Sequence, residues 1–346
     1  MSSDIIPGLS RHLRERSIQM KRFLKITLFF LAITFCMANQ ITSLPLQSSP
    51  REVAVESGER IVRPVTKTIE QEAHHKIIFM ISPPRSLTSA FARMMQARGD
   101  FSVYDEPSVL AFNLLHAADR GTFFLDWFKP EAPKTYVEFK NIIFNDLKKT
   151  NVFIKEMTFS VKDFLTKDIE FIKDPRIHFV FLIRNPHDAL ISVYKKLPIS
   201  QQNLGFALPV ISYESCFQIY EHLKQHATHK PYIVLTEKLY SEPEKTIQDF
   251  SATMHIPFIP SSLKWESLGE TFNGASWHEY KKEDQMYHWH DNAIRSTGFQ
   301  KPNVYALDPH GVPTFQEITE PDGKILCMQI YKENMKFYKK FLAEVK

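Results

Sequence analysis

The sequence predicts an α/β protein of three layers, in which helices cover both faces of a mostly parallel five-stranded sheet. Short runs of apolar, β-branched and aromatic residues recur along the chain, as expected for strands that are covered on both faces. Segments with apolar residues at helical spacing alternate with these runs. Strand–helix–strand alternation is typical of a parallel sheet, which gives the fold class.

The individual elements follow in order from Lys76. The predicted strands are five short apolar runs, at residues 76–82, 101–107, 151–157, 177–184 and 231–237. The predicted helices are the segments between and after them, at residues 86–98, 136–149, 186–196, 213–228 and 325–345. The region from Trp265 to Pro321 is less periodic, and we interpret it as long loops over one edge of the sheet.

Length and composition favour one large domain, which we assign to residues 75–346. The chain has 346 residues, of which 43% are hydrophobic, and its 28 phenylalanines can fill a sizeable core. The formal net charge of +4 is a mild excess that does not indicate nucleic-acid binding, so we expect no nucleic-acid partner.

The residues before this domain divide into a leader and a linker. Residues 1–38 are first basic and then apolar, and from Met20 onward they have the anatomy of a secretory signal peptide, with cleavage after Ala38. We expect an exported or secretory location, with a cytoplasmic location as the alternative, and membrane association only through this N-terminal segment. Residues 39–74 are rich in Ser, Pro, Glu and Thr without periodicity, which indicates a disordered linker.

The candidate site lies beyond the carboxyl ends of the strands, where ligands of parallel sheets bind. The first strand is followed by SPPRSLTS (82–89), in which the prolines turn the chain sharply. We expect Ser86, Thr88 and Ser89 in the first turn of the next helix, where unpaired N–H groups attract an anion. Arg85 adds a planar guanidinium suited to phosphate or sulfonate. The structural alternative is that Arg85 pairs with a carboxylate and Ser86 caps the helix.

A second segment repeats this design after the fourth strand. Arg184 is followed by Pro186 at the start of a helix and by Ser192 within it. Arg184 and Ser192 are eight residues apart, which is close to two helical turns, so the serine can face the helix entrance. This arginine and hydroxyl can hold a second phosphate.

Together the two segments resemble the sulfotransferases, over about residues 76–265. PPRSLTS resembles the family loop that binds the 5′-phosphosulfate of 3′-phosphoadenosine 5′-phosphosulfate (PAPS), and RNPHDALIS resembles the element that binds its 3′-phosphate. The resemblance implies a fold like that of P-loop nucleotide hydrolases, PAPS as the donor, no metal, and a small-molecule or glycan acceptor. It assigns cofactor binding to Arg85, Ser86, Thr88, Ser89, Arg184, Ser192 and, from a short match in a later loop, Arg295.

Two positions depart from the family pattern. Leu87 stands where the family usually has glycine, so the loop is less free to wrap a phosphate. Cytosolic members carry a catalytic histidine two residues after a lysine, but here Lys155 is followed by Met157. Bacterial and Golgi-type members often use a glutamate near the second strand, a place that Glu106 fits. We therefore expect Glu106 to be the general base, with Arg85 and Lys155 stabilising charge on the leaving phosphate.

Two other functions stay open. One is a P-loop kinase or nucleotide hydrolase, although the GxxxxGK[ST] spacing that such enzymes use is absent. The other is a protein of the same fold that binds 3′-phosphoadenosine 5′-phosphate (PAP) and has lost turnover.

Histidine and cysteine add no expected site. His288 and His290, interpreted as neighbours on one face of a strand, have no further ligands at metal-binding spacing, so we expect no metal. Cys216 and Cys327 are either bridged or buried thiols.

Overall fold

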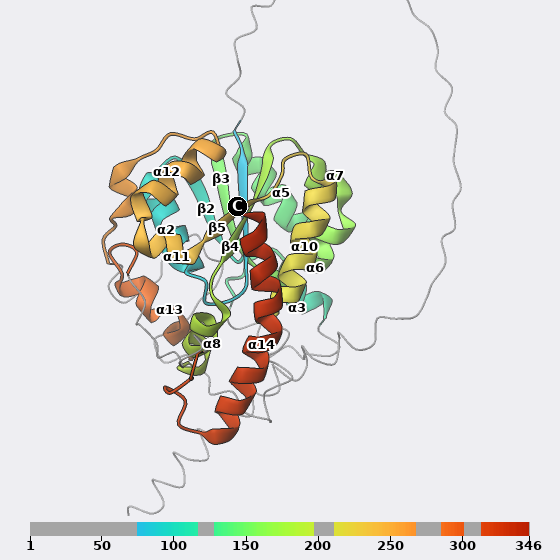
Figure 1. Ribbon diagram of the computed structural model, residues 1–346. Helices are drawn as coiled ribbons and strands as arrows, with labels where there is room; N and C mark the ends of the chain where they lie inside the picture. Colours follow the sequence, from blue (N-terminus) through green and yellow to red (C-terminus); the bar gives the residue numbers. More distant parts are fainter. Residues whose placement is uncertain (1–74, 117–127, 197–210, 268–284, 301–312, 346) are drawn as a thin grey trace, which may run out of the picture.

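The computed structural model describes five stretches of the 346-residue chain (Figure 1). They are residues 75–116, 128–196, 211–267, 285–300 and 313–345. The predicted leader (1–38) and linker (39–74) lie outside the described residues. Within these five stretches, no helix is long and apolar enough to span a membrane.

The predicted parallel five-stranded sheet is confirmed, with the strand order β2-β3-β1-β4-β5 and parallel pairing throughout. The strands are β1 (Ile77–Ser82), β2 (Phe101–Asp105), β3 (Asn151–Met157), β4 (Ile177–Ile183) and β5 (Tyr232–Leu235). The carboxyl ends of the strands face downward in Figure 1, toward α8 and α13. The strand β1, which comes first among the described strands, is therefore the central strand of the sheet.

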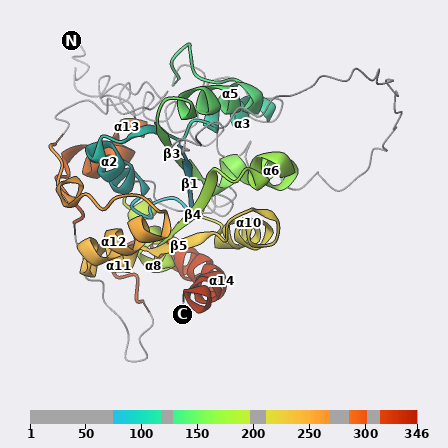
Figure 2. The ribbon, with the colours of Figure 1, turned by 90° about the horizontal axis from the view of Figure 1, so that it is seen from above.

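Helices cover both faces of the sheet, which gives the three predicted layers. Seen from above in Figure 2, α2, α11 and α12 lie on one side of the strands, and α5, α6, α10 and α14 lie on the other. The helices are α2 (Thr88–Arg98), α3 (Val109–Leu115), α5 (Tyr136–Leu147), α6 (Thr158–Lys167), α7 (Ile169–Lys173), α8 (Pro186–Tyr194), α10 (Tyr213–His226), α11 (Thr236–Ser241), α12 (Pro243–Thr253), the 3-10 helix η2 (Pro260–Leu263), α13 (Gln285–Arg295) and α14 (Pro321–Glu344).

The central strand β1 separates two hydrophobic cores. Ile77, Phe79 and Ile81 pack into the core under α5, α6, α10 and α14, whereas Ile78 and Met80 pack into the core under α2 and α12. Successive side chains of a strand point to opposite faces, so a strand covered on both sides must be apolar at every position. This explains the uninterrupted apolar run in the sequence.

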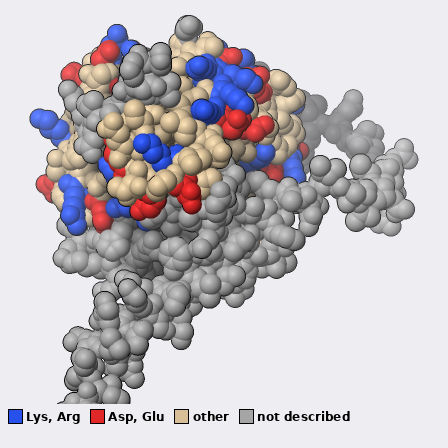
Figure 3. Space-filling view, turned by 60° about the horizontal axis from the view of Figure 1, so that its bottom comes forward, with Lys and Arg blue, Asp and Glu red and all other residues tan. Residues whose placement is uncertain are grey.

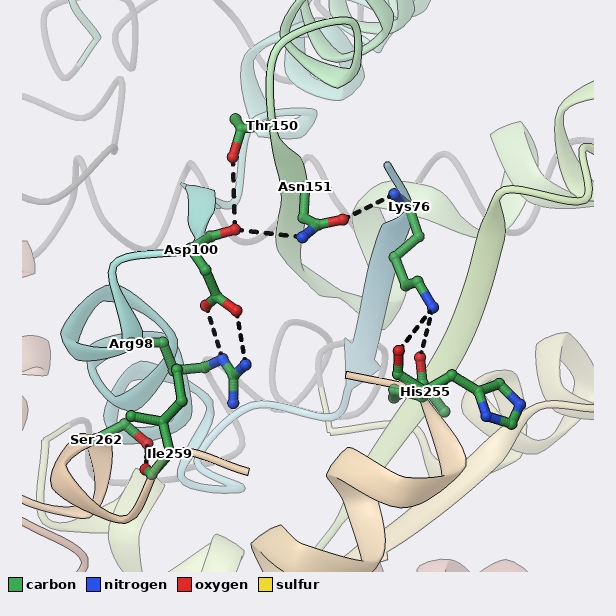
Figure 4. Close-up of polar contacts among 9 residues, drawn as sticks. Lys76, Arg98, Asp100, Thr150, Asn151, His255, Ile259 and Ser262 are labelled. Atoms are coloured by element: carbon green, nitrogen blue, oxygen red, sulfur yellow. Dashed lines mark hydrogen bonds and ion pairs between the residues drawn. The ribbon is translucent and has the colours of Figure 1, made fainter. Parts of the chain in front are cut away.

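Asn151 ties the amino-terminal edge of the sheet together (Figure 4). Its Oδ1 accepts a hydrogen bond from the backbone N of Lys76 at 3.0 Å, and its Nδ2 donates to the carbonyl oxygen of Asp100 at 3.4 Å. Asn151 is the first residue of β3, and these two partners directly precede β1 and β2. Because the three strands start in register, their carboxyl ends emerge at one edge.

The interpretation of the His288–His290 segment as part of a strand is wrong. Both residues lie in helix α13, where positions two apart do not share a face. The buried Ile294 follows the partly buried His290 by four residues, which is the spacing of one helix face. The region from Trp265 to Pro321 thus contains a helix and is not formed by loops alone.

Both cysteines in the described part of the chain are buried free thiols. Cys216 lies on α10 and Cys327 on α14. The sequence left open whether Cys216 and Cys327 form a disulfide or are buried thiols, and in the structure they are buried thiols.

Candidate functional site

The first corner of the site is the turn from β1 into α2. The helix begins at Thr88, and Ser86 lies before it, with a buried hydroxyl that donates to the carbonyl oxygen of Pro83 at 2.9 Å. The expectation that Ser86 lies in the first helical turn is therefore wrong, because its side chain holds the turn itself. Thr88, which is buried, and Ser89, which is partly exposed, do form that turn.

The second corner is the turn from β4 into α8. Asn185 caps the helix, since its side chain accepts a hydrogen bond from the backbone N of His187 at 3.0 Å, and Pro186 is the first helical residue. Arg184, directly after the strand, is buried. The corner thus has the strand–arginine–helix arrangement that the sequence predicts.

The two corners contact each other. Nη1 of Arg184 donates to the backbone oxygen of Arg85 at 2.8 Å, and Nε of Arg85 donates to Oγ of Ser192 at 3.0 Å. Ser192 is thus bonded to the arginine of the first corner. The contact follows from the strand order, because β1 and β4 are neighbours in the sheet.

Like charges are held together at this contact. Burial, together with the positive charge of Arg184, lowers the pKa of Arg85 to about 10, so the Arg85 guanidinium is still charged near neutral pH. Asp188 lies 3.9 Å from Nη2 of Arg184, and the guanidinium of Arg184 lies over the ring of Tyr240. Within the described residues, Nε of Arg184 is buried without a hydrogen-bond partner. A cationic pair in which Arg184 is buried and has an unused donor favours an anionic ligand.

The charges on the outer surface are arranged differently. On the described surface that Figure 3 shows, basic side chains lie among acidic ones. Water and salt screen such exposed charges, whereas a buried pair is screened much less. The arginine pair is therefore the stronger attraction for a specific anion.

A second charged cluster lies at the ends of β2 and β3. Nζ of Lys155 contacts Oδ1 of Asp105 at 2.9 Å and also Oε1 of Glu106. Lys155 is only 1% exposed, so its ammonium group is shielded from solvent. Burial lowers the pKa of Lys155, but the two carboxylates outweigh burial and raise it to about 12.

Glu106 is the member of this cluster that solvent reaches. Its side chain is 17% exposed, against 4% for Asp105. Its backbone N donates to the carbonyl oxygen of Lys155 at 2.7 Å, and its φ of 52° turns the chain away from the strand. Glu106 is thus placed where an acceptor molecule can approach it.

His290 of α13 belongs to the same neighbourhood. Burial lowers the pKa of its imidazole to about 4, and the charges of Asp105, Lys155, Glu106 and Arg85 also act on it. The imidazole is therefore neutral near pH 7. Sequence reasoning missed this residue because the segment was interpreted as a strand. An ion pair of 3.7 Å between Lys196 and Asp291 links α13 to the end of α8.

Arg295, predicted to bind the cofactor, is the last residue of α13 and is exposed. It differs in this from the buried Arg184, and its role stays a prediction. Among the described residues, no group of three or more His, Cys, Asp or Glu side chains is arranged to hold a metal ion.

The fold and the site define a parallel α/β protein with two arginine-bearing corners at one edge of its sheet. A family model described as "Sulfotransferase domain" matches residues 76–309, which is more than half of the chain. The chain therefore belongs to the sulfotransferase family, and the resemblance seen in its motifs is confirmed.

Two curated relatives come from Arabidopsis thaliana. Branched-chain-amino-acid aminotransferase-like protein 2 is 32% identical over 232 residues, which cover 66% of this chain and 37% of the relative. Branched-chain-amino-acid aminotransferase-like protein 1 is 28% identical over 235 residues, which cover 67% of this chain and 38% of the relative. The chain thus spans less than two fifths of the length of these relatives.

Two sulfotransferases of known structure match this chain, both at low identity and low TM-score. The sulfotransferase domain from the curacin biosynthetic pathway is 12% identical, with 77% of this chain and 97% of that chain covered and a TM-score of 0.39. Mouse sulfotransferase SULT7A1 complexed with PAP is 13% identical, with 75% and 84% covered and a TM-score of 0.37.

Proposed function

We propose that this protein transfers a sulfuryl group from PAPS to a hydroxyl or amine of a small-molecule or glycan acceptor. The observation that carries the proposal is the direct contact between the Arg85 and Arg184 corners. One ligand with negative charge at two separate groups can engage both corners at once. PAPS has such groups, in its 3′-phosphate and its 5′-phosphosulfate.

Each corner has donors that fit one of these groups. Arg184, with its unused Nε, and Ser192 would hold the 3′-phosphate. Arg85, Thr88, Ser89 and the N–H groups that start α2 would hold the 5′-phosphosulfate.

The acidic cluster supplies the chemistry. In the reaction the bond from sulfur to the bridging oxygen of PAPS breaks, a bond from sulfur to the acceptor atom forms, and PAP leaves. Lys155 and Arg85 stabilise the negative charge that builds up on the bridging oxygen. An ammonium has three N–H donors, of which the carboxylates of Asp105 and Glu106 take two. Glu106, the exposed carboxylate, accepts the proton that the acceptor loses.

Binding of PAP, measured by titration calorimetry, tests the arginine pair. We expect Arg184→Ala to weaken PAP binding at least ~10-fold, because a hydrogen bond to a charged group contributes about 1.5–3 kcal/mol. Arg176→Ala is the matched control, since Arg176 lies at the other end of the same strand and pairs with Asp174 at 2.7 Å. Unchanged affinity in Arg184→Ala, or no binding by the wild-type protein, would contradict the proposal.

Transfer itself is tested with radiolabelled PAPS and a panel of phenols, alcohols, amines and sugars, in the presence of a metal chelator. We expect labelled product without added metal. A requirement for magnesium would favour the kinase or hydrolase alternative. Tight PAP binding with no transfer to any member of the panel would favour the PAP-binding protein that has lost turnover.

A further inference from the structure

Glu156 is a buried carboxyl group to which the proposed reaction assigns no role. It follows Lys155 on β3 and is 0% exposed. Because adjacent side chains of a strand point to opposite faces, Glu156 and Lys155 approach the end of β2 from different sides. Both reach the same short segment, residues 105–108, which we call the catalytic bend.

Glu156 contacts the catalytic bend from the face of β3 that is opposite Lys155. Its Oε1 accepts a hydrogen bond from the backbone N of Ser108 at 2.7 Å. Its Oε2 lies 2.9 Å from Oγ of Ser160, in the first turn of α6. On the other side, Lys155 contacts the side chains of Asp105 and Glu106. The bend is thus held from both faces of β3.

The hydrogen bonds of Ser160 can be satisfied by a protonated Glu156. Oγ of Ser160 lies 2.9 Å from Oε2 of Glu156 and also 2.9 Å from the carbonyl oxygen of Met157. A hydroxyl has one hydrogen, and a carbonyl oxygen can only accept. When Ser160 donates to Met157, its contact with Glu156 is a hydrogen bond only if the carboxyl group carries the proton.

The electrostatic surroundings agree with a neutral carboxyl group. Burial raises the pKa of Glu156 to about 8, the hydrogen bonds from Ser108 and Ser160 oppose this, and the charge of Glu106 adds to it. Asp105 and Lys155, the other charged groups at the bend, are paired with each other. Ionised Glu156 would place a second negative charge beside Glu106.

We propose that Glu156 is a positioning residue that, as a neutral acid, holds the catalytic bend and so fixes Glu106 beside Lys155. The inference rests on the proposed function, in which Glu106 accepts the proton of the acceptor. The backbone of Glu106 has a positive φ of 52°, a conformation that persists only where the surroundings enforce it. Glu156 stabilises this conformation through the hydrogen bond that it accepts from the backbone N of Ser108.

Two substitutions separate the shape of Glu156 from its charge. Glu156→Gln keeps an acceptor for Ser108 and a donor for Ser160, as the neutral acid does. Glu156→Ala removes both. Glu138→Ala is the matched control, because Glu138 accepts a hydrogen bond from the backbone N of Lys134 at 2.7 Å on the exposed surface.

Three readouts are compared at equal pH. They are the hydrogen exchange of the Ser108 amide, the affinity for PAP, and the release of PAP from PAPS with p-nitrophenol or water as acceptor. In Glu156→Ala we expect exchange to rise and PAP release to fall, each at least ~10-fold, because the amide loses its bond and Glu106 its position. Affinity for PAP should stay within about twofold. Glu156→Gln and Glu138→Ala should resemble the wild-type protein in all three.

The pH profile gives a readout that a purely structural role would not move. We expect PAP release by the wild-type protein to fall above an apparent pKa near 8, where Glu156 ionises, and this fall to be absent in Glu156→Gln. Wild-type rate in Glu156→Ala, or an equal loss in both variants, would overturn the inference. So would an alkaline fall that Glu156→Gln retains. If Glu156→Ala does not fold, the profile of Glu156→Gln decides.

Failure of the proposed function is distinguishable from failure of this inference. A wild-type protein that neither binds PAP nor releases it from PAPS would refute the function. The exchange of Ser108 in the variants would still decide whether Glu156 holds the bend. Unchanged exchange in a folded Glu156→Ala protein refutes that hold even when PAP is released normally.

Discussion

Three residues with positive φ lie at the carboxyl edge of the sheet, namely Arg85 at 66°, Leu87 at 69° and Glu106 at 52°. The left-handed region costs a residue with a Cβ roughly 1–2 kcal/mol, so each needs a compensating contact. Arg85 is bonded to Ser192, and Glu106 contacts Lys155. Two of these strained positions, Arg85 and Glu106, are residues to which we assign chemistry, and strain of this kind is common at functional sites.

Substitution of Leu87 tests the backbone strain that its positive φ implies. At φ 69° glycine is relaxed whereas alanine is not, so we expect Leu87→Gly to be more stable than Leu87→Ala by about 1 kcal/mol. Urea unfolding measures the difference. Ala97, exposed on α2, is the control, because Ala97→Gly should destabilise the protein by roughly 0.5–1 kcal/mol. Equal stability of the two Leu87 variants would contradict the positive φ.

Glu106 is the residue on which turnover should depend. We expect Glu106→Gln to reduce sulfuryl transfer at least ~100-fold, since an amide cannot accept the proton, while PAP affinity changes less than about twofold. Initial rates with an acceptor from the panel and calorimetry with PAP measure the two effects. Glu214→Gln, on the exposed face of α10, serves as the control. A Glu106→Gln protein with wild-type rate would exclude Glu106 as the base.

At the scale of elements, continuous apolar runs were the reliable signal. All five strands, and the helices α2, α5, α8, α10 and α14, lie where the runs and spacings predict them, with ends shifted by a few residues. The strand order could not be predicted, because β1 is apolar on both faces and fits the centre or any other covered place. Helix α13 was missed because the spacing of two between His288 and His290 was interpreted as that of a strand. The helical spacing of four between His290 and Ile294 was not considered.

The site was predictable only in part, for a related reason. Arg85, Glu106 and Arg184 each follow a strand, and Lys155 lies in the last three residues of β3, so the rule about carboxyl ends finds them. Which of them touch depends on strand order and on backbone angles, which motifs do not specify. The role of Glu156 could not be predicted from the sequence, because a glutamate next to a lysine in a strand matches no known motif.

Asn151 is an element-scale test of how the edge is assembled (Figure 4). Asn151→Ala removes both of its hydrogen bonds to the residues before β1 and β2, and we expect a loss of about 1–2 kcal/mol in urea unfolding. Asn145→Ala is the control, because Asn145 is exposed on α5 and its side chain accepts a hydrogen bond from Lys148 at 3.0 Å. Its loss should stay below ~0.5 kcal/mol. Equal effects would show that Asn151 does not hold the strands.

At the scale of the whole molecule, the sheet order assembles the site from distant segments. β3, β1 and β4 are consecutive in the sheet, and their ends carry Lys155, Arg85 and Arg184. Neighbouring strands lie about 4.8 Å apart, so three cations that are far apart in sequence meet at one edge. Asp105 and Glu106 come from β2, next to β3, and offset the charge of Lys155. Because the charge of Lys155 is offset, Arg85 and Arg184 form the cationic part of the site.

A histidine near the amino-terminal ends of the strands should make the stability of the protein depend on pH. His178, at the start of β4, stacks on His229 with ring centroids 4.2 Å apart. Burial lowers the pKa of His178 to about 4, with the charges of His229, Lys76 and His255 acting in the same direction. The unfolded chain takes up a proton near pH 6.5, where the folded protein still resists it. Stability from this residue is therefore complete above about pH 6.5 and is lost as pH falls toward 4.

His178→Phe isolates this contribution, because phenylalanine keeps a flat ring against His229 and cannot be protonated. Between about pH 7.5 and pH 4.5, we expect the wild-type protein to lose about 1–2 kcal/mol more than His178→Phe, a figure reduced for partial exposure. Urea unfolding at the two pH values measures the difference. Gln225→Ala, at an exposed position on α10, should lose as much as the wild-type protein. An equal loss in His178→Phe would mean that the ring is protonated in the folded state as readily as in the unfolded chain.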